Sequence, residues 1–236
     1  MANKILVYGW YHKNNIGDDL FMDAFHKLFP QFDFTFVDNI NIANVKRADA
    51  VFIGGGSFLY DAPKYEPGAL ELLKDKPLFY IGVGSETGIH STHVALMQQA
   101  KLIAIRNNNG FDKIKNNINH NVILIPDIVY SLKEKTNNQV IEKSVLIIPN
   151  VTLVPQNNDP HWKFAAWEYF KSEFAQFLDV LVDNKFKLSF LSMCNNTKSC
   201  DSWAAIEIIT KMKYRDSRYL LPTVSGIKEI ASTFSN

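Results

Sequence analysis

Short apolar runs alternate with longer amphipathic segments through most of the chain. Runs of four or five residues are typical of buried strands, and segments with an apolar residue every three or four positions are typical of helices. In the first half, the predicted strands are 5–8, 33–37, 50–53, 78–81, 102–105 and 122–125, and the predicted helices are 20–29, 68–74, 91–101 and 111–116. Regular alternation of strand and helix indicates an α/β fold, in which a parallel sheet is flanked by helices.

The same alternation resumes after a polar, aperiodic stretch at 133–143, which we interpret as a linker between two domains. The predicted domains are therefore 1–132 and 144–236. In the second domain the predicted strands are 145–148, 187–192 and 219–221, and the predicted helices are 162–183, 201–212 and 225–234. Three strands make a small sheet for an independent domain, so we expect the second domain to be incomplete.

The loop after the first strand, Asn14–Asp19, is polar and contains a glycine. It lies at the carboxyl end of a strand, which is where open α/β sheets bind ligands. Gly17 lets the chain pass close to a bound group, and Asp18 or Asp19 can cap the following helix. A ligand loop and a plain capped helix start are both consistent with this pattern.

Two further loops rich in glycine follow predicted strands. They are Gly54-Gly55-Gly56-Ser57 and Gly82-Val83-Gly84-Ser85. Glycines at a strand end keep side chains away, so that a ligand can approach the backbone. The alternative is a tight turn chosen for its geometry.

Arg106 ends the predicted strand 102–105, and Asp127 follows the strand 122–125. A guanidinium binds carboxylates and phosphates well because it offers paired donors in a fixed fork. Arg106 is therefore the best candidate for anion binding. The structural alternative is an ion pair between Arg106 and Asp127.

Composition narrows the functional classes. Lys and Arg number 25 against 24 Asp and Glu, so no overall charge attracts the chain to nucleic acid. The sequence has no signal-peptide pattern, no apolar run long enough to span a bilayer and only two cysteines. We therefore expect a cytoplasmic protein, with a peripheral association with the membrane as the alternative. No zinc-ligand spacing is present, and His90 and His93, near a helix start, are expected to be solvated. The aromatic residues of the predicted helix 162–183 are expected to pack against the second sheet, and the alternative is that Trp162 and Trp167 face the cleft and bind the apolar face of a sugar.

The loops share their order and spacing with a known family. The motifs are Tyr11–Asp19, Gly54–Leu59, Gly82–Gly84, Arg106 with the asparagines after it, and Pro126-Asp127. Together they resemble the polysaccharide pyruvyl transferase family, over residues 4–132 and more weakly onward to 234. The resemblance implies a fold like that of the GT-B glycosyltransferases, with two Rossmann-like domains and parallel sheets.

The resemblance also implies a reaction, in which the pyruvyl unit of phosphoenolpyruvate is transferred to a sugar hydroxyl of a surface glycan. Phosphoenolpyruvate would be a co-substrate, and no other cofactor and no metal is expected. The expected partners are the donor and a glycan acceptor, without nucleic acid, and an exposed sheet edge would favour a homo-oligomer. The candidate substrate-binding residues are Asn15, Gly17, Asp18, Asp19, Gly55, Gly56, Ser57, Gly82, Gly84, Arg106 and Asp127.

The sequence departs from the family in two places. Asn107-Asn108-Asn109 follows Arg106 where relatives commonly carry an acid, and no Arg-Leu-His motif occurs, although the family's catalytic histidine lies in one. The motif is expected just beyond 230–234, so the chain is either shortened or a natural short form that binds without turnover. The catalytic residue therefore stays unassigned. The alternatives are a GT-B glycosyltransferase with a nucleotide-sugar donor and a non-catalytic glycan- or anion-binding remnant.

Overall fold

The chain divides into two compact units in the computed structural model. The first comprises Met1–His12 and Gly17–Glu134, and the second comprises Lys13–Ile16 and Lys135–Asn236. The residues described are 3–85, 88–118, 121–132, 143–150, 154–195, 200–216 and 219–221. Predicted helix 225–234 and most of the predicted linker lie outside them.

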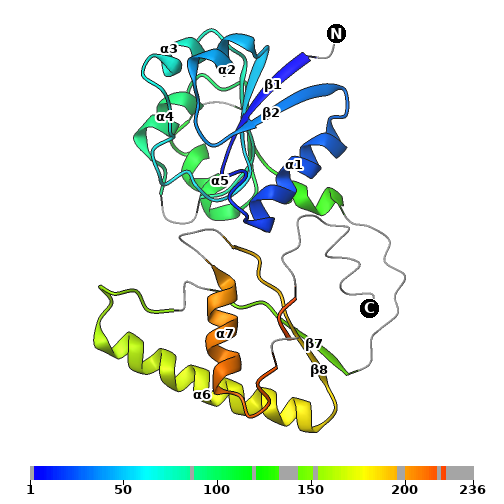
Figure 1. The fold of residues 1–236 in the computed structure, drawn as a ribbon. Helices are drawn as coiled ribbons and strands as arrows, with labels where there is room; N and C mark the ends of the chain where they lie inside the picture. The colour runs from blue at the N-terminus through cyan, green and yellow to red at the C-terminus, as the bar shows by residue number, and fades with distance from the viewer. Residues whose placement is uncertain are drawn as a thin grey trace. The chain divides into compact units, whose positions relative to one another are not determined.

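A six-stranded sheet in the order β2-β1-β3-β4-β5-β6 forms the centre of the first unit (Figure 1). All neighbouring strands are parallel, which confirms the predicted α/β class. The strands are β1 (Asn3–Tyr8), β2 (Phe32–Val37), β3 (Ala50–Gly54), β4 (Leu78–Val83), β5 (Leu102–Ile105) and β6 (Val122–Leu124). The helices are α1 (Ile16–Leu28), α2 (Ile42–Arg47), α3 (Ala69–Leu73), α4 (Ser91–Met97), α5 (Asn108–Lys115) and the 3-10 helix η1 (Ile128–Leu132).

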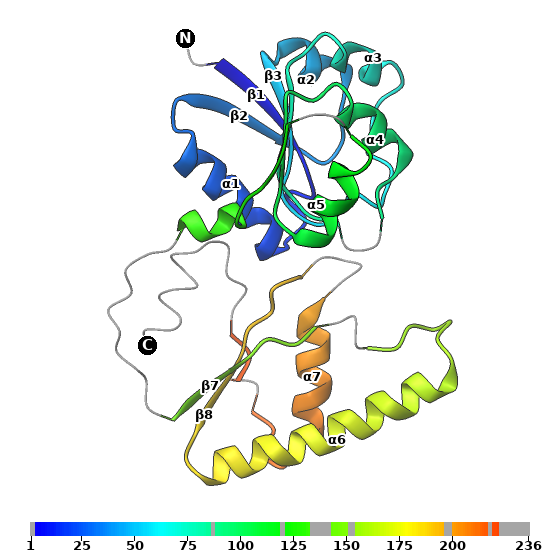
Figure 2. The same cartoon turned by 180° about the vertical axis from the view of Figure 1, so that it is seen from behind.

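Helices cover both faces of this sheet, α1 on one side and α2 to α5 on the other (Figures 1 and 2). Successive strand residues point to opposite faces, so each strand supplies both layers. On the α1 side Phe25 lies against the rings of Phe34 and Phe52, at centroid distances of 5.8 and 6.0 Å. On the other side Val51 and Ile53 join the larger apolar cluster. Burial on both faces explains why the strands are almost continuously apolar.

The structure corrects several predicted boundaries in the first unit. Helix α2 was not predicted, and α1 begins at Ile16, so that Asp18 and Asp19 lie in its first turn and not at its cap. Gly82 lies within β4, at a shift of register, and not in the following loop. The segment after Arg106 is not an extended loop, because α5 already begins at Asn108.

His93 was expected to be solvated, and this is wrong. The side chain is fully buried, and its Nδ1 lies 3.1 Å from the hydroxyl oxygen of Tyr80. The helix periodicity of α4 turns His93 toward β4 together with Leu96 and Met97, which are also buried. Burial, with a smaller contribution from His90, lowers the pKa of His93 from 6.5 to about 4.

The second unit contains the parallel strands β7 (Ser144–Ile147) and β8 (Lys187–Phe190) and the helices α6 (His161–Asp183) and α7 (Asp201–Lys211). Leu220 forms one further parallel bridge to Phe190, at the position of the third predicted strand. The short segment Lys13–Ile16 groups with this unit because Ile16 N–H donates to the carbonyl of Met193, at 2.8 Å. Within the described residues, no helix combines the length and the apolar character needed to cross a membrane.

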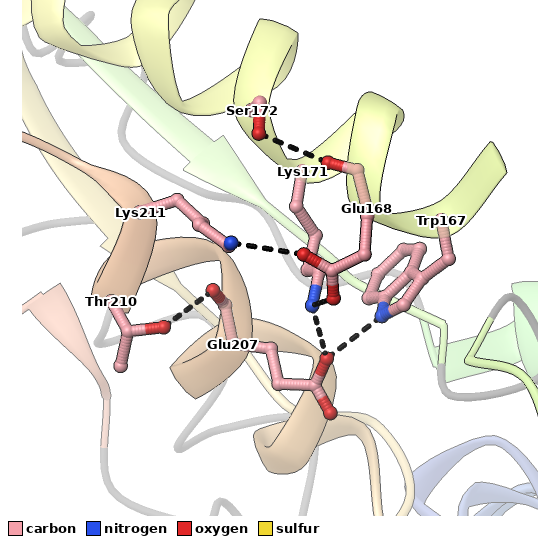
Figure 3. A network of polar contacts seen from close by, with 7 residues as sticks. All are labelled: Trp167, Glu168, Lys171, Ser172, Glu207, Thr210 and Lys211. Atoms are coloured by element: carbon pink, nitrogen blue, oxygen red, sulfur yellow. Dashed lines mark hydrogen bonds and ion pairs between the residues drawn. The ribbon is translucent and has the colours of Figure 1, made fainter. Parts of the chain in front are cut away.

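A polar cluster joins α6 to α7 in this unit (Figure 3). The ammonium of Lys171, only 5% exposed, lies 2.5 Å from a carboxylate oxygen of Glu168 and 2.9 Å from one of Glu207. Trp167 donates its indole N–H to the same Glu207 oxygen at 2.8 Å, and Lys211 pairs with Glu168 at 2.9 Å. Trp167 is therefore buried between helices and is not a sugar platform, whereas Trp162 is 67% exposed.

Because its charge is buried between two carboxylates, Lys171 is expected to contribute to stability more than an exposed lysine does. Lys171→Ala would leave Glu207 without its cation and should lower the free energy of unfolding by about 2 kcal/mol. Lys163→Ala is the matched control on the same helix, since the Lys163 side chain is 45% exposed where that of Lys171 is 6% exposed, so loss of its pair with Asp159 should cost clearly less. Urea unfolding followed by tryptophan fluorescence measures the free energy of unfolding of both variants. Equal decreases in Lys171→Ala and Lys163→Ala would contradict the larger contribution of the buried lysine.

Candidate active site

Six loops of the first unit leave the sheet at one edge, because parallel strands place all their carboxyl ends together. They follow β1, β2, β3, β4, β5 and β6. The chain passes from β1 to β2 on one side, and β3 pairs with β1 on the other, so β1 and β3 flank the point where the strand order reverses. Open α/β sheets bind ligands in the crevice outside such a reversal point.

Arg106, at the carboxyl end of β5, links three of these loops. Its Nη1 donates to Asp127 Oδ2 at 2.5 Å, and its Nη2 donates to Ser57 Oγ at 2.9 Å. The other carboxylate oxygen of Asp127 accepts the backbone N–H of Val129 at 3.0 Å, which fixes the orientation of the acid. The ion pair that was the structural alternative for Arg106 is therefore formed, while the arginine side chain stays 23% exposed.

Phe21, from α1, supports the guanidinium from the apolar side. The Cζ atom of Arg106 lies 5.5 Å from the centroid of the Phe21 ring. Gly55 and Gly82 make room for this ring: both have positive φ, and a Cβ would lie 2.9 Å from the ring at Gly55 and 3.3 Å from it at Gly82. The helical periodicity of the sequence marks Phe21 only as a core residue, so its contact with Arg106 could not be predicted.

Gly56 and Gly84 lie directly against the polar side chains of the cluster. A Cβ at Gly84 would lie 2.8 Å from Ser57 Oγ and 3.0 Å from Arg106 Nε. A Cβ at Gly56 would lie 2.7 Å from Asp18 Oδ1. Any side chain at these positions would displace the groups that surround the arginine, so glycine is required by close approach.

Asp18 is a titratable group of this cluster with a raised pKa. Burial raises its pKa from 3.8 to about 6; Arg106 opposes this shift, and the neighbouring Asp19 adds to it. Tyr11 lies beside these acids and is fully buried, with its hydroxyl donating to the carbonyl of Gly54. Burial, with Asp18 and Asp19, raises the pKa of Tyr11 well above 10, so the phenol stays protonated. Asp18 can therefore exchange a proton near neutral pH.

Asn107, which follows Arg106, holds the third glycine-rich loop. Its side-chain oxygen accepts the backbone N–H of Ser85 at 3.3 Å, and its amide donates to the carbonyl of Ser85 at 3.1 Å. The Ser85 hydroxyl donates to the carbonyl of Gly88 at 2.7 Å. A carboxylate at position 107 could not donate to that carbonyl, so an asparagine here fits the loop that it holds. Sequence reasoning treated Asn107 only as a change of local charge.

The structure brings together part of the predicted set. Ser57, Gly84 and Asp127 lie against the side chain of Arg106, Asp18 interacts with its charge and lies against Gly56, and Gly55 and Gly82 make room for Phe21 beneath it. Asp19 lies outside the cluster and accepts the backbone N–H of His12 at 2.9 Å. Asn15 forms an antiparallel bridge with Cys194, and Gly17 is exposed in the first turn of α1. In the described part of the chain, His, Cys, Asp and Glu residues form no group of three suited to a metal ion.

Comparison with known proteins adds one finding. The family model described as polysaccharide pyruvyl transferase matches residues 15–236. A search of curated proteins and a search of solved structures each found no match.

The raised pKa of Asp18 makes a prediction for stability. The native state binds its proton more tightly than the unfolded chain, so ionisation of Asp18 destabilises the fold as pH rises from 3.8 to about 6. Asp18→Asn removes this ionisation and should stabilise the protein by about 2 kcal/mol at neutral pH, with the gain disappearing below about pH 4.

Unfolding curves of the wild type and of Asp18→Asn, recorded between acid and neutral pH, test this prediction for Asp18. His93 acts in the opposite direction, because its lowered pKa makes the fold lose stability as pH falls from 6.5 to about 4. Its contribution is present in both proteins and cancels in their difference. A difference that does not change with pH would contradict the prediction.

Proposed function

The chain belongs to the polysaccharide pyruvyl transferase family, and we propose that it binds phosphoenolpyruvate at Arg106 as a pyruvyl donor for a sugar hydroxyl of a surface glycan. The observation that supports this most directly is the Arg106 guanidinium, which is partly exposed at the carboxyl edge of the sheet, with Gly84 directly beside it.

Phosphoenolpyruvate carries a phosphate and a carboxylate, and both need donors that are fixed before binding. Arg106 has five N–H donors, of which Asp127 and Ser57 each accept one. These two contacts and the Phe21 ring fix the plane of the guanidinium. Little reorganisation is then needed when an anion binds, and this favours stabilisation of developing charge.

Transfer requires a proton on the methylene carbon of the donor. The acceptor oxygen then forms a bond to the adjacent carbon and loses its own proton, and phosphate leaves with the electron pair of the broken carbon–oxygen bond. A second hydroxyl of the same sugar bonds to that carbon and loses its proton, which completes a pyruvate ketal. Asp18 is suited to carry the first of these protons, because it lies against Gly56 in the same cluster and its pKa is close to neutral. We therefore assign it the role of proton donor.

Donor binding without turnover is the second candidate function. It needs only the anion site, in which Asp127 and Ser57 hold the Arg106 guanidinium. Both functions use Arg106 for the anion, so they differ only in whether phosphate is released.

Arg106→Ala tests the donor site. Phosphoenolpyruvate at about 100 times its dissociation constant should stabilise the wild type by about 2.7 kcal/mol and raise its melting temperature by several degrees. The shift should disappear in Arg106→Ala and be reduced in Arg106→Lys, which keeps the charge and loses the fork. Arg47→Ala, an exposed arginine at the end of α2, is the control and should keep the full shift.

Free phosphate and nucleotide sugars complete this experiment. A shift with phosphate as large as that with phosphoenolpyruvate would indicate a general anion site, and a shift with a nucleotide sugar alone would indicate a glycosyltransferase. Phosphate release with a sugar acceptor separates transfer from binding alone.

A further inference from the structure

A pocket opens at the carboxyl edge of the same sheet, and its lining includes none of the residues that contact Arg106. It is lined by Tyr8 and Trp10 after β1, by Asp38 after β2, and by Phe58, Asp61 and Lys64 after β3. None of these residues was nominated from the sequence. The pocket therefore lies across the ends of β2, β1 and β3, where the strand order reverses and ligands of open α/β sheets bind.

The pocket is a direct neighbour of the candidate donor site along the chain. Ser57 accepts a hydrogen bond from Arg106, and the next residue, Phe58, forms a wall of the pocket. Strands in a sheet lie about 4.8 Å apart, so β1 and β5 are separated by about 14 Å across β3 and β4. The Arg106 side chain spans part of this distance, because its Nη2 reaches Ser57 after β3, and Ser57 and Phe58 connect the two sites.

The lining combines a flat apolar surface with hydrogen-bond donors and acceptors. Trp10 is 38% exposed, and Phe58 packs edge-on against Tyr8 at a centroid distance of 5.7 Å. Asp38 and Asp61 supply carboxylate acceptors, and the ammonium of Lys64, 5.2 Å from the centre of the Trp10 ring, supplies donors.

Tyr8 adds a neutral hydroxyl to this set. Its oxygen accepts the backbone N–H of Lys64 at 2.9 Å. Burial raises the pKa of Tyr8 against the effect of this hydrogen bond, and Asp38 and Asp61 raise it further, so the phenol keeps its proton. The hydroxyl is thus held as a donor beside two carboxylates.

We propose that this pocket is the acceptor subsite, where a neutral sugar ring of the glycan stacks on Trp10 and its hydroxyls bind Asp38, Asp61 and Lys64. The inference rests on the proposed pyruvyl transfer. The alternating apolar faces and hydroxyls of a sugar match an aromatic ring bordered by acceptors and a donor. The pocket has a volume of about 40 Å³, less than a whole sugar ring, so the rest of the ring would lie over the exposed part of Trp10.

The charges of the lining predict selectivity. Two carboxylates and one ammonium leave the pocket with a net negative charge. An acidic sugar such as a glucuronide would bring a further carboxylate next to Asp38 and Asp61, which opposes binding. A neutral hexose avoids this repulsion, so we expect neutral glycosides to bind more tightly than acidic ones.

Saturation-transfer NMR on the full chain tests the subsite. The probes are methyl galactoside, methyl glucoside and methyl glucuronide, each with and without phosphoenolpyruvate. At least one neutral glycoside should bind the wild type, about tenfold more weakly in Trp10→Ala, and Asp61→Asn should weaken it as well. Trp162→Ala removes a tryptophan of even greater exposure on α6 and should leave binding unchanged.

The donor measurement separates this inference from the proposed function. Trp10→Ala should keep the stabilisation by phosphoenolpyruvate that depends on Arg106. The subsite is wrong if no neutral glycoside binds the wild type under either condition, if Trp10→Ala and Trp162→Ala bind equally, or if the glucuronide binds as well as the neutral probes. If the glycosides bind through Trp10 but phosphoenolpyruvate does not bind, the pyruvyl transfer fails and the sugar pocket stands.

Discussion

Parallel pairing of six strands is the constraint on which the candidate site depends. It places the carboxyl ends of all the strands at one edge, so residues as distant in sequence as Ser57, Arg106 and Asp127 meet around one guanidinium. Parallel strands need crossover helices, and these cover both faces with apolar side chains. The helices leave the carboxyl edge of the sheet uncovered, and polar side chains can lie there without disturbing the core.

Burial of charged groups at this edge of the sheet lowers the stability of the fold. Asp18 keeps a raised pKa although Arg106 is close enough to lower it, which means that burial outweighs the attraction of the cation. A carboxylate that destabilises its own fold when ionised is typical of functional positions, where stability and activity conflict. The fully buried His93 shares this electrostatic cost but lies among Tyr80 and Phe58, where it packs α4 onto the sheet.

The second unit depends on the packing of two helices more than on its sheet. Its described sheet has only the two paired strands β7 and β8, and much of its order comes from α6 and α7. Lys171 buries an ammonium between these helices, and Glu168, Glu207 and Trp167 surround it. Only Lys171 is buried in this cluster, so its ammonium depends on the carboxylates of Glu168 and Glu207, which reach it from two helices.

The sequence by itself determined the fold class and the ingredients of the site. Strand and helix periods are local properties, so the alternating α/β plan was predictable, and so were Arg106, Ser57 and Asp127 as polar residues at strand ends. The tertiary structure alone decided which of them meet. Phe21 beneath the guanidinium, Asn107 on the Ser85 loop, Gly82 inside β4 and the burial of His93 follow from neighbours far along the chain. Trp10 was not predicted as a binding residue for the same reason. An exposed ring becomes a candidate sugar-binding surface only when other strands place carboxylates beside it.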